Sequence, residues 1–200
     1  MRVKICGITR PEDAQTAEAA GADAIGLIFA DGSRRRITVA RAREISAALG
    51  PFVTRVGVFT DAGADEVLDA ALGARLDVVQ LHGEVPPGRL AQLRRSVRVV
   101  RVVRFRVGLT PDEVALDDAD AVMLDGVRPG SGEAFDWNAA TAWRGYPRLV
   151  LAGGLRPDTV ADAVRRLRPH AVDVASGVES APGVKDPDAV HAFVRAAREA

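Results

Sequence analysis

Short apolar runs alternate with helical patterns along the whole chain, and this alternation restricts the fold more than any other feature. The runs are nearly continuous in Val, Ile and Leu, which is typical of parallel strands buried on both faces. Parallel neighbours need a crossover connection, so the stretches between the runs should be helices. The eight predicted strands are VKIC (3–6), DAIGLIF (23–29), TRVGVF (54–59), DVVQL (77–81), RVVRVV (98–103), AVML (121–124), RLVLA (148–152) and AVDVA (171–175).

The connecting stretches carry apolar residues at the helical spacing i, i+3, i+4 and i+7. In DTVADAVRRLRP these positions are Val160, Ala163, Val164 and Leu167. In the last stretch of the chain they are Val190, Phe193, Val194 and Ala197. Each set forms one apolar stripe, so both stretches are predicted to be helices packed on the sheet.

Several helix ends are marked by residue type. Thr9 with Glu12 predicts a capping box at the start of the first helix. Asp186 before a proline predicts an N-cap followed by a first-turn proline in the last helix. Gly21 stands where a glycine is expected after the first helix.

Eight strand–helix units in 200 residues average about 25 residues each. We therefore predict an α/β fold, a (β/α)8 TIM barrel, that forms one domain over residues 1–200. The alternative is an open, doubly wound sheet, which accommodates eight strands less easily. No change in composition and no long linker divides the sequence into two parts.

Composition excludes several classes of protein. Acidic and basic residues balance at 27 each, which argues against nucleic-acid and membrane-surface binding. No apolar run approaches the roughly 20 residues of a membrane span, and no signal peptide is recognisable. One cysteine and three scattered histidines offer no metal-ligand spacing and fit a cytoplasmic protein. Of the 27 basic residues only Lys4 and Lys185 are lysines, which we attribute mainly to codon bias.

In a barrel of this kind the active site lies at the C-terminal ends of the strands. The first strand ends at Cys6, the fourth runs into Gln80–His82, and the sixth is followed at once by Asp125. Side chains alternate along a strand, so Lys4 and Cys6 share one side. These strand ends are the candidate sources of the chemistry.

Glycine-rich turns follow the last three strands and point to a phosphate ligand. Glycine lets backbone N–H groups approach an anion closely, and the loops after strands seven and eight are the usual phosphate site of such barrels. Each glycine pair alone is equally consistent with an ordinary tight turn. The predicted phosphate-binding residues are Gly130, Gly153, Gly154, Ser176 and Gly177.

The candidate catalytic residues also have structural interpretations. A lone Cys6 is often a small buried hydrophobic residue, but at a strand end it could serve as a base if nearby positive charge lowers its pKa. Asp125 is either its acid partner or a turn aspartate before a glycine. His82 either binds substrate or anchors its loop. The run Arg34–Arg36 is either a solvated charge cluster or the source of a carboxylate clamp.

Taken together, nine motifs resemble the phosphoribosylanthranilate isomerase family of tryptophan biosynthesis. Their order and spacing extend over nearly the whole chain. The matching motifs are VKICGITRPEDA, GADAIGLIF, SRRRI, VGVF, VQLHGE, MLDG, PGSGEAFDW, LAGGLRPDTV and VDVASGVESAPGVKD. The resemblance implies a (β/α)8 barrel that converts N-(5-phosphoribosyl)anthranilate into 1-(2-carboxyphenylamino)-1-deoxyribulose 5-phosphate by an Amadori rearrangement, without a cofactor.

The resemblance also implies roles for single residues. Cys6 matches the general base, Asp125 the general acid, and Arg35 the arginine that holds the anthranilate carboxylate. Asp173 matches an acidic residue of the eighth strand, and we include it with His82 among the substrate-binding residues. The turn glycines match phosphate-binding positions. The chain departs from the family at residue 175, where alanine replaces a frequent serine, and the choice of Arg35 within the triple arginine is open by one position.

Three rival functions remain at this stage: a metal-dependent epimerase, an indoleglycerol-phosphate synthase, and a non-catalytic barrel that senses phosphate ligands. The first lacks metal ligands here and the second lacks the lysines it needs. The expected partner is a small phosphorylated substrate, and the chain is a monomer or a homodimer. The aminoaldose substrate of histidine biosynthesis is left open. We also hypothesise that Lys4 pairs with Asp125 or Asp173 and lowers the pKa of Cys6.

Overall fold

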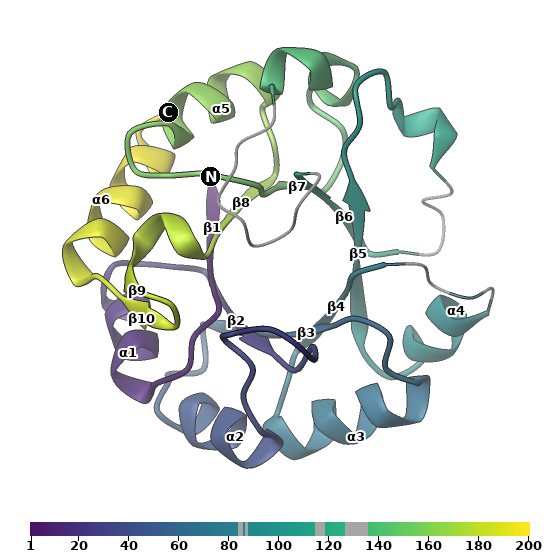
Figure 1. Cartoon of the computed structure of the whole chain (residues 1–200), viewed down its shortest axis with the longest axis vertical. Coiled ribbons are helices and arrows are strands. Elements are labelled where there is room, and N and C mark those ends of the chain that lie inside the picture. Colours follow the sequence, from purple (N-terminus) through teal and green to yellow (C-terminus); the bar gives the residue numbers. More distant parts are fainter. Residues whose placement is uncertain (84–85, 87, 115–118, 127–135) are drawn as a thin grey trace.

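The computed structural model describes residues 1–83, 86, 88–114, 119–126 and 136–200. Eight parallel strands close into a barrel in sequence order, and β8 pairs with β1 to complete the ring (Figure 1). The (β/α)8 prediction is therefore confirmed, and the open doubly wound sheet is excluded. The barrel strands are β1 (Arg2–Cys6), β2 (Ala24–Ile28), β3 (Thr54–Phe59), β4 (Val78–Leu81), β5 (Arg98–Arg104), β6 (Ala121–Asp125), β7 (Leu149–Leu151) and β8 (Ala171–Val174).

Helices surround the barrel on its outer side (Figure 1). Most crossovers carry an α-helix, as predicted, but the described residues after β5 and β6 form 3-10 helices instead. The outer elements are α1 (Pro11–Ala19), α2 (Val39–Ala47), α3 (Ala64–Ala74), α4 (Arg89–Leu93), η1 (Pro111–Glu113), η2 (Trp137–Trp143), α5 (Val160–Leu167) and α6 (Pro187–Arg198).

A short hairpin interrupts the last crossover. After β8 the chain forms η3 (Ser176–Val178) and then the antiparallel strands β9 (Glu179–Ala181) and β10 (Val184–Lys185). Figure 1 shows this hairpin beside α1. The Thr9 hydroxyl, in the loop before α1, donates to the Gly183 carbonyl oxygen at 2.6 Å. The hairpin is thus attached to the loop that follows β1.

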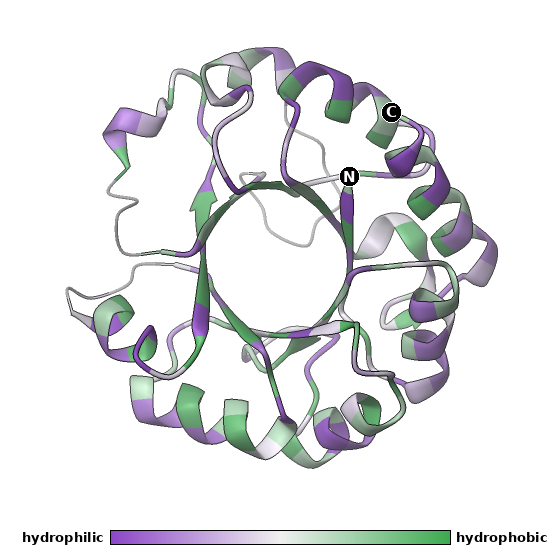
Figure 2. Ribbon diagram, turned by 180° about the vertical axis from the view of Figure 1, so that it is seen from behind, coloured by the Kyte–Doolittle hydropathy of each residue, from purple (hydrophilic) through white to green (hydrophobic). Residues whose placement is uncertain are grey.

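The apolar stripes predicted for the last two helices are buried as expected. All four apolar positions of α5 and all four of α6 are fully or nearly fully buried, and they belong to the main core between helices and barrel. In Figure 2 the outer helices alternate between hydrophobic and hydrophilic residues, as expected of helices packed on one side only. A smaller cluster of Val102, Met123, Val150 and Ala152 is separate from this core.

Two of the three predicted helix ends are confirmed. The Asp186 carboxylate accepts a hydrogen bond from the Ala189 N–H at 3.1 Å, with proline at the first helical position. Gly21 follows α1 with a φ of +89°. The capping box at Thr9 is wrong, because α1 begins at Pro11 with Arg10 as its N-cap. The Thr9 hydroxyl is instead engaged by the hairpin, a partner distant in sequence.

Candidate active site

One pocket at the C-terminal ends of the strands gathers five of the predicted site residues. Its volume is about 440 Å³, and its lining includes Cys6, Arg35, His82, Asp125 and Asp173. These residues belong to β1, β6 and β8 and to the loops after β2 and β4. Barrel closure thus brings side chains from across the whole sequence into one cavity, which we identify as the candidate active site.

Cys6 is the last residue of β1 and lies beside a glycine of the neighbouring strand. Gly26 is its neighbour on β2, and a β-carbon there would lie 2.5 Å from Cys6 Sγ and 3.0 Å from Lys4 Nζ. The thiol and the ammonium therefore share the space above Gly26. A larger residue on β2 would displace one or both of them.

Lys4 points toward the barrel interior and is buried there. Its Nζ donates to Asp173 Oδ1 at 2.7 Å, so Asp173 is the partner among the two that were predicted. Burial alone would lower the pKa of Lys4, but the charges of Asp173 and Cys6 raise it above its ordinary value. Lys4 is therefore a permanent cation beside the thiol.

The surroundings of Cys6 favour the neutral thiol over the thiolate. Burial raises its pKa and the Asp173 carboxylate adds to that effect, whereas the charges of Lys4 and Lys185 lower it. The hypothesis that Lys4 lowers the pKa of Cys6 has the correct direction, but burial outweighs it. An added positive charge in the pocket would favour the thiolate.

Asp125 is the last residue of β6 and is almost completely buried. Burial raises its pKa to about 6, although its Oδ1 accepts a 2.7 Å hydrogen bond from the Gly126 N–H, which acts in the opposite direction. The charge of Asp173 raises the pKa further. About a tenth of Asp125 is thus protonated at pH 7, far more than for a carboxyl with an ordinary pKa, and a general acid needs that proton.

His82 and Gln80 form a hydrogen-bonded pair at the end of β4. The Gln80 amide nitrogen donates to His82 Nε2 at 2.9 Å, because the amide NH2 has no acceptor capacity. Burial and the charge of Lys4 lower the pKa of His82 to about 4, so the imidazole is neutral at pH 7. The Gln80 side-chain oxygen is buried and has no hydrogen-bond partner among the described residues.

The described members of the predicted phosphate-binding set belong to the turns after β7 and β8, and they are not among the residues that line the pocket. Gly153 and Gly154 have φ values of +83° and +67°, which favour glycine. Gly177 packs against the backbone carbonyl of Leu155, so the two turns touch each other. The predicted residue Gly130 lies outside the described residues.

Within the triple arginine, the structure distinguishes the three side chains. Arg35 lies in the pocket and makes two hydrogen bonds to Glu179, at 2.8 and 2.7 Å. Arg34 also lines the pocket but is exposed. Arg36 is exposed and contacts Asp31 at 3.2 Å. Arg35 is thus the partly buried arginine of the three, and its role as the carboxylate ligand stays a prediction.

Glu179 and Lys185, beside the pocket, are absent from the sequence-based prediction, and Gln80 was named there only as part of a strand end. The Lys185 ammonium donates to Glu179 Oε1 at 2.8 Å and to the Ala175 carbonyl oxygen at 3.1 Å. The rarity of lysine in this arginine-rich chain was a sequence signal for Lys185. Both lysines are buried, and the charges of both act on Cys6.

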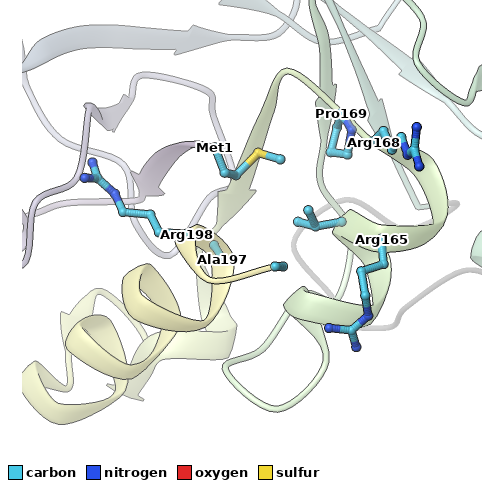
Figure 3. Close-up of a pocket in the computed structure, with 8 residues that line it drawn as sticks. Met1, Arg165, Arg168, Pro169, Ala197 and Arg198 are labelled. Atoms are coloured by element: carbon cyan, nitrogen blue, oxygen red, sulfur yellow. The ribbon is translucent and has the colours of Figure 1, made fainter.

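A second hollow of about 490 Å³ lies at the opposite end of the barrel (Figure 3). Met1, Arg168 and Pro169, which precede β1 and β8, contribute to its lining, together with Arg165 and Arg198 of α5 and α6. Its described lining contains no Cys, His, Asp or Glu side chain. It therefore offers no acid–base pair and is not the candidate active site.

Two other features are absent from the part of the chain that the structure describes. There, no group of three or more His, Cys, Asp or Glu side chains is arranged to hold a metal ion. No described helix is long and apolar enough to cross a membrane.

Comparison with known proteins gives full-length matches. The family model of N-(5'-phosphoribosyl)anthranilate (PRA) isomerase matches residues 3–196. An N-(5'-phosphoribosyl)anthranilate isomerase of Deinococcus radiodurans is 45% identical, over 99% of this chain and 97% of the relative.

Solved structures agree with these sequence matches. The phosphoribosyl anthranilate isomerase of Thermus thermophilus is 47% identical with a TM-score of 0.93, over 100% of this chain and 99% of its own. A phosphoribosyl anthranilate isomerase in complex with reduced 1-(o-carboxyphenylamino)-1-deoxyribulose 5-phosphate is 40% identical with a TM-score of 0.89, over all of both chains.

Proposed function

The chain belongs to the N-(5'-phosphoribosyl)anthranilate isomerase family, and from this premise we propose how its own residues divide the chemistry. The family assignment gives the activity, which is isomerisation of phosphoribosylanthranilate in tryptophan biosynthesis. We propose that Asp125 is the general acid and Cys6 the general base of an Amadori rearrangement. The observation that carries this proposal is that both side chains line one pocket, from strands three steps apart around the barrel.

The first step is the opening of the ribose ring. Asp125 donates its proton to the ring oxygen while the bond from that oxygen to C1′ breaks, and the anilino nitrogen supplies the electron pair that forms a C1′ iminium. The pKa of about 6 supports this role, because a carboxyl with an ordinary pKa would hold almost no proton at pH 7. The iminium then adds a positive charge to the pocket.

The second step removes the proton from C2′. The Cys6 thiolate accepts that proton, and the C–H electrons form the C1′–C2′ double bond of an enolamine while the iminium nitrogen regains its pair. The enolamine gains a proton at C1′ and loses one from the C2′ hydroxyl, which yields the ketone. The cationic iminium favours the thiolate, together with the charge of Lys4, against the burial that raises the pKa of Cys6.

Other residues of the site would bind the substrate. We assign the anthranilate carboxylate to Arg35, and the ribose region to His82 and Asp173, which lie in the same pocket. The backbone of Gly153, Gly154 and the turn after β8 would hold the phosphate, since the two turns touch each other. Ala175 carries no hydroxyl, so backbone donors would take the larger share of that binding. For the relative solved with the reduced product, the ligand carries the same carboxylate and phosphate groups.

We propose that residues 1–200 act as one domain, as a monomer or homodimer in the cytoplasm, with a small phosphorylated substrate and no nucleic-acid or membrane partner. Sedimentation of the purified chain would distinguish the monomer from the homodimer.

Turnover of freshly generated phosphoribosylanthranilate, followed by the decay of its fluorescence, tests the function. The unmodified protein should convert the substrate, and Cys6→Ser and Asp125→Asn should each lose about 10²- to 10⁴-fold in kcat. An inactive unmodified protein would contradict the function. Full activity in both variants would contradict the mechanism but not the family assignment.

A further inference from the structure

The carboxylate of Glu179 holds Arg35 on one side and Lys185 on the other. Its Oε1 accepts hydrogen bonds from Arg35 Nε and from Lys185 Nζ, both at 2.8 Å, and its Oε2 accepts from Arg35 Nη2 at 2.7 Å. The three side chains are 5%, 13% and 0% exposed for Glu179, Arg35 and Lys185. The contacts therefore form a largely dry cluster beside the pocket.

The bonds to Glu179 use one edge of the Arg35 guanidinium, the edge that carries Nε and Nη2. A guanidinium has five N–H groups in a planar fork, so Nη1 and the second N–H of Nη2 remain on its other edge. That edge is suited to a second carboxylate in bidentate geometry. Arg35 lines the pocket, and its stem lies against Gly7, where a β-carbon would be 2.5 Å from Arg35 Cδ.

The hairpin β9–β10 fixes the position of Glu179. Glu179 and Lys185 are register partners on the two strands. The Lys185 backbone N–H donates to the buried Asp13 carboxylate of α1 at 3.3 Å, and the Thr9 hydroxyl donates to the hairpin at Gly183. The carboxylate is therefore anchored to the same segment of chain that follows Cys6.

Charge favours this arrangement. Burial alone would raise the pKa of Glu179, but the hydrogen bonds from Arg35 and Lys185 hold it below its ordinary value. Two cations and one anion leave the cluster with a net charge of +1. Arg35 can thus be held by a carboxylate and still present positive charge to an anionic group in the pocket.

We infer that Glu179 is a positioning residue, which orients the free edge of Arg35 toward the carboxylate of the substrate. This inference rests on the proposed function, because it takes the anthranilate carboxylate as the group that Arg35 binds. Glu179 itself does not touch the substrate. Its effect should therefore appear only with ligands that carry the carboxylate.

Two stable ligands that differ in this one group provide the test. Reductive amination of ribose 5-phosphate with anthranilate or with aniline gives secondary amines with and without the carboxylate. We expect Glu179→Gln to raise the Kd of the carboxylated ligand about tenfold and to leave the Kd of the aniline ligand within about twofold. In turnover, KM should rise while kcat changes by less than about threefold. The matched control is Glu12→Gln, an exposed acid before Asp13, which should change neither Kd.

A second variant tests the same role if Glu179→Gln fails to fold. Glu179→Asp retains the negative charge that Lys185 needs but withdraws it by one methylene, and it should show the same selective effect at smaller size. Equal weakening of both ligands, no weakening of the carboxylated ligand, or tighter binding of it would each overturn the positioning role. Absence of turnover in the unmodified protein would overturn the proposed function and this inference with it. If the unmodified protein is active, the comparison of the two ligands tests the role of Glu179 alone.

Discussion

Lys4 and Asp173 form a 2.7 Å ion pair inside the barrel, where they are register partners on β1 and β8. Both side chains are about nine-tenths buried or more, so each charge offsets part of the cost of burying the other. Cys6 lies two residues after Lys4 and points to the same side of β1. The pair therefore determines much of the electrostatic field at the thiol, with its two charges acting in opposite directions.

The opposite effects of the two charges can be measured by alkylation of Cys6 as a function of pH. Lys4→Met should move the midpoint of thiolate formation to higher pH, because the nearest cation is lost. Asp173→Asn should move it to lower pH, since the charge that raises the pKa of Cys6 is lost. Arg43→Met, an exposed change on α2, is the control. An unchanged midpoint in Lys4→Met would refute the electrostatic role of Lys4.

Activity should depend on pH through Asp125 on the acidic side. In the proposed mechanism, the reactive form has a protonated Asp125, with a pKa of about 6, and a deprotonated Cys6, whose pKa lies higher. The product of these two fractions rises up to about pH 6, stays level up to the pKa of Cys6, and then falls. Initial rates of kcat/KM from pH 4.5 to 10 measure this profile. A profile that is already level well below pH 6 would argue against the buried acid.

The same buried carboxyl should cost stability at neutral and alkaline pH. Its pKa is raised from 3.8 to about 6 by folding, so its contribution is fully present below 3.8 and is lost as the pH rises through 6. We expect Asp125→Asn to stabilise the fold by up to about 3 kcal/mol at pH 8 and by little at pH 3.5. Urea unfolding at both values measures the difference.

Asp69→Asn, an exposed change on α3, is the control for that experiment and should show no such pH dependence. Equal free energies of unfolding for Asp125→Asn and the unmodified protein at pH 8 would mean that folding does not raise the pKa of Asp125.

Gly26 should be essential for the geometry of the thiol. A methyl group there would lie 2.5 Å from Cys6 Sγ, so Gly26→Ala must displace the thiol or Lys4. We expect kcat to fall by at least about tenfold, and stability to fall by about 1–3 kcal/mol from overpacking. Gly63→Ala is the matched control, because its added carbon meets no atom within 4 Å. Retention of full kcat in Gly26→Ala would show that the position of Cys6 Sγ is not critical.

Local patterns in the sequence predicted most of the barrel, because strand content and helix stripes are encoded by neighbouring residues. Alternation on β1 also predicted that Lys4 would need an acidic partner, and only the register of β1 with β8 decided for Asp173. The cluster of Glu179 and Lys185 was not predictable in this way. It depends on a hairpin whose partners, such as Thr9, lie more than 170 residues away in the sequence. The same distant contact explains the wrong capping box.

The central claim, that Asp125 opens the ring and Cys6 removes the C2′ proton, is tested most directly by a deuterium isotope effect. Substrate deuterated at C2′ is compared with ordinary substrate in single turnovers of Cys6→Ser and Asp125→Asn. We expect a large primary isotope effect in Cys6→Ser, where proton removal limits the rate, and almost none in Asp125→Asn, where ring opening does. The same isotope effect in both variants, or none in Cys6→Ser, would contradict this division of roles.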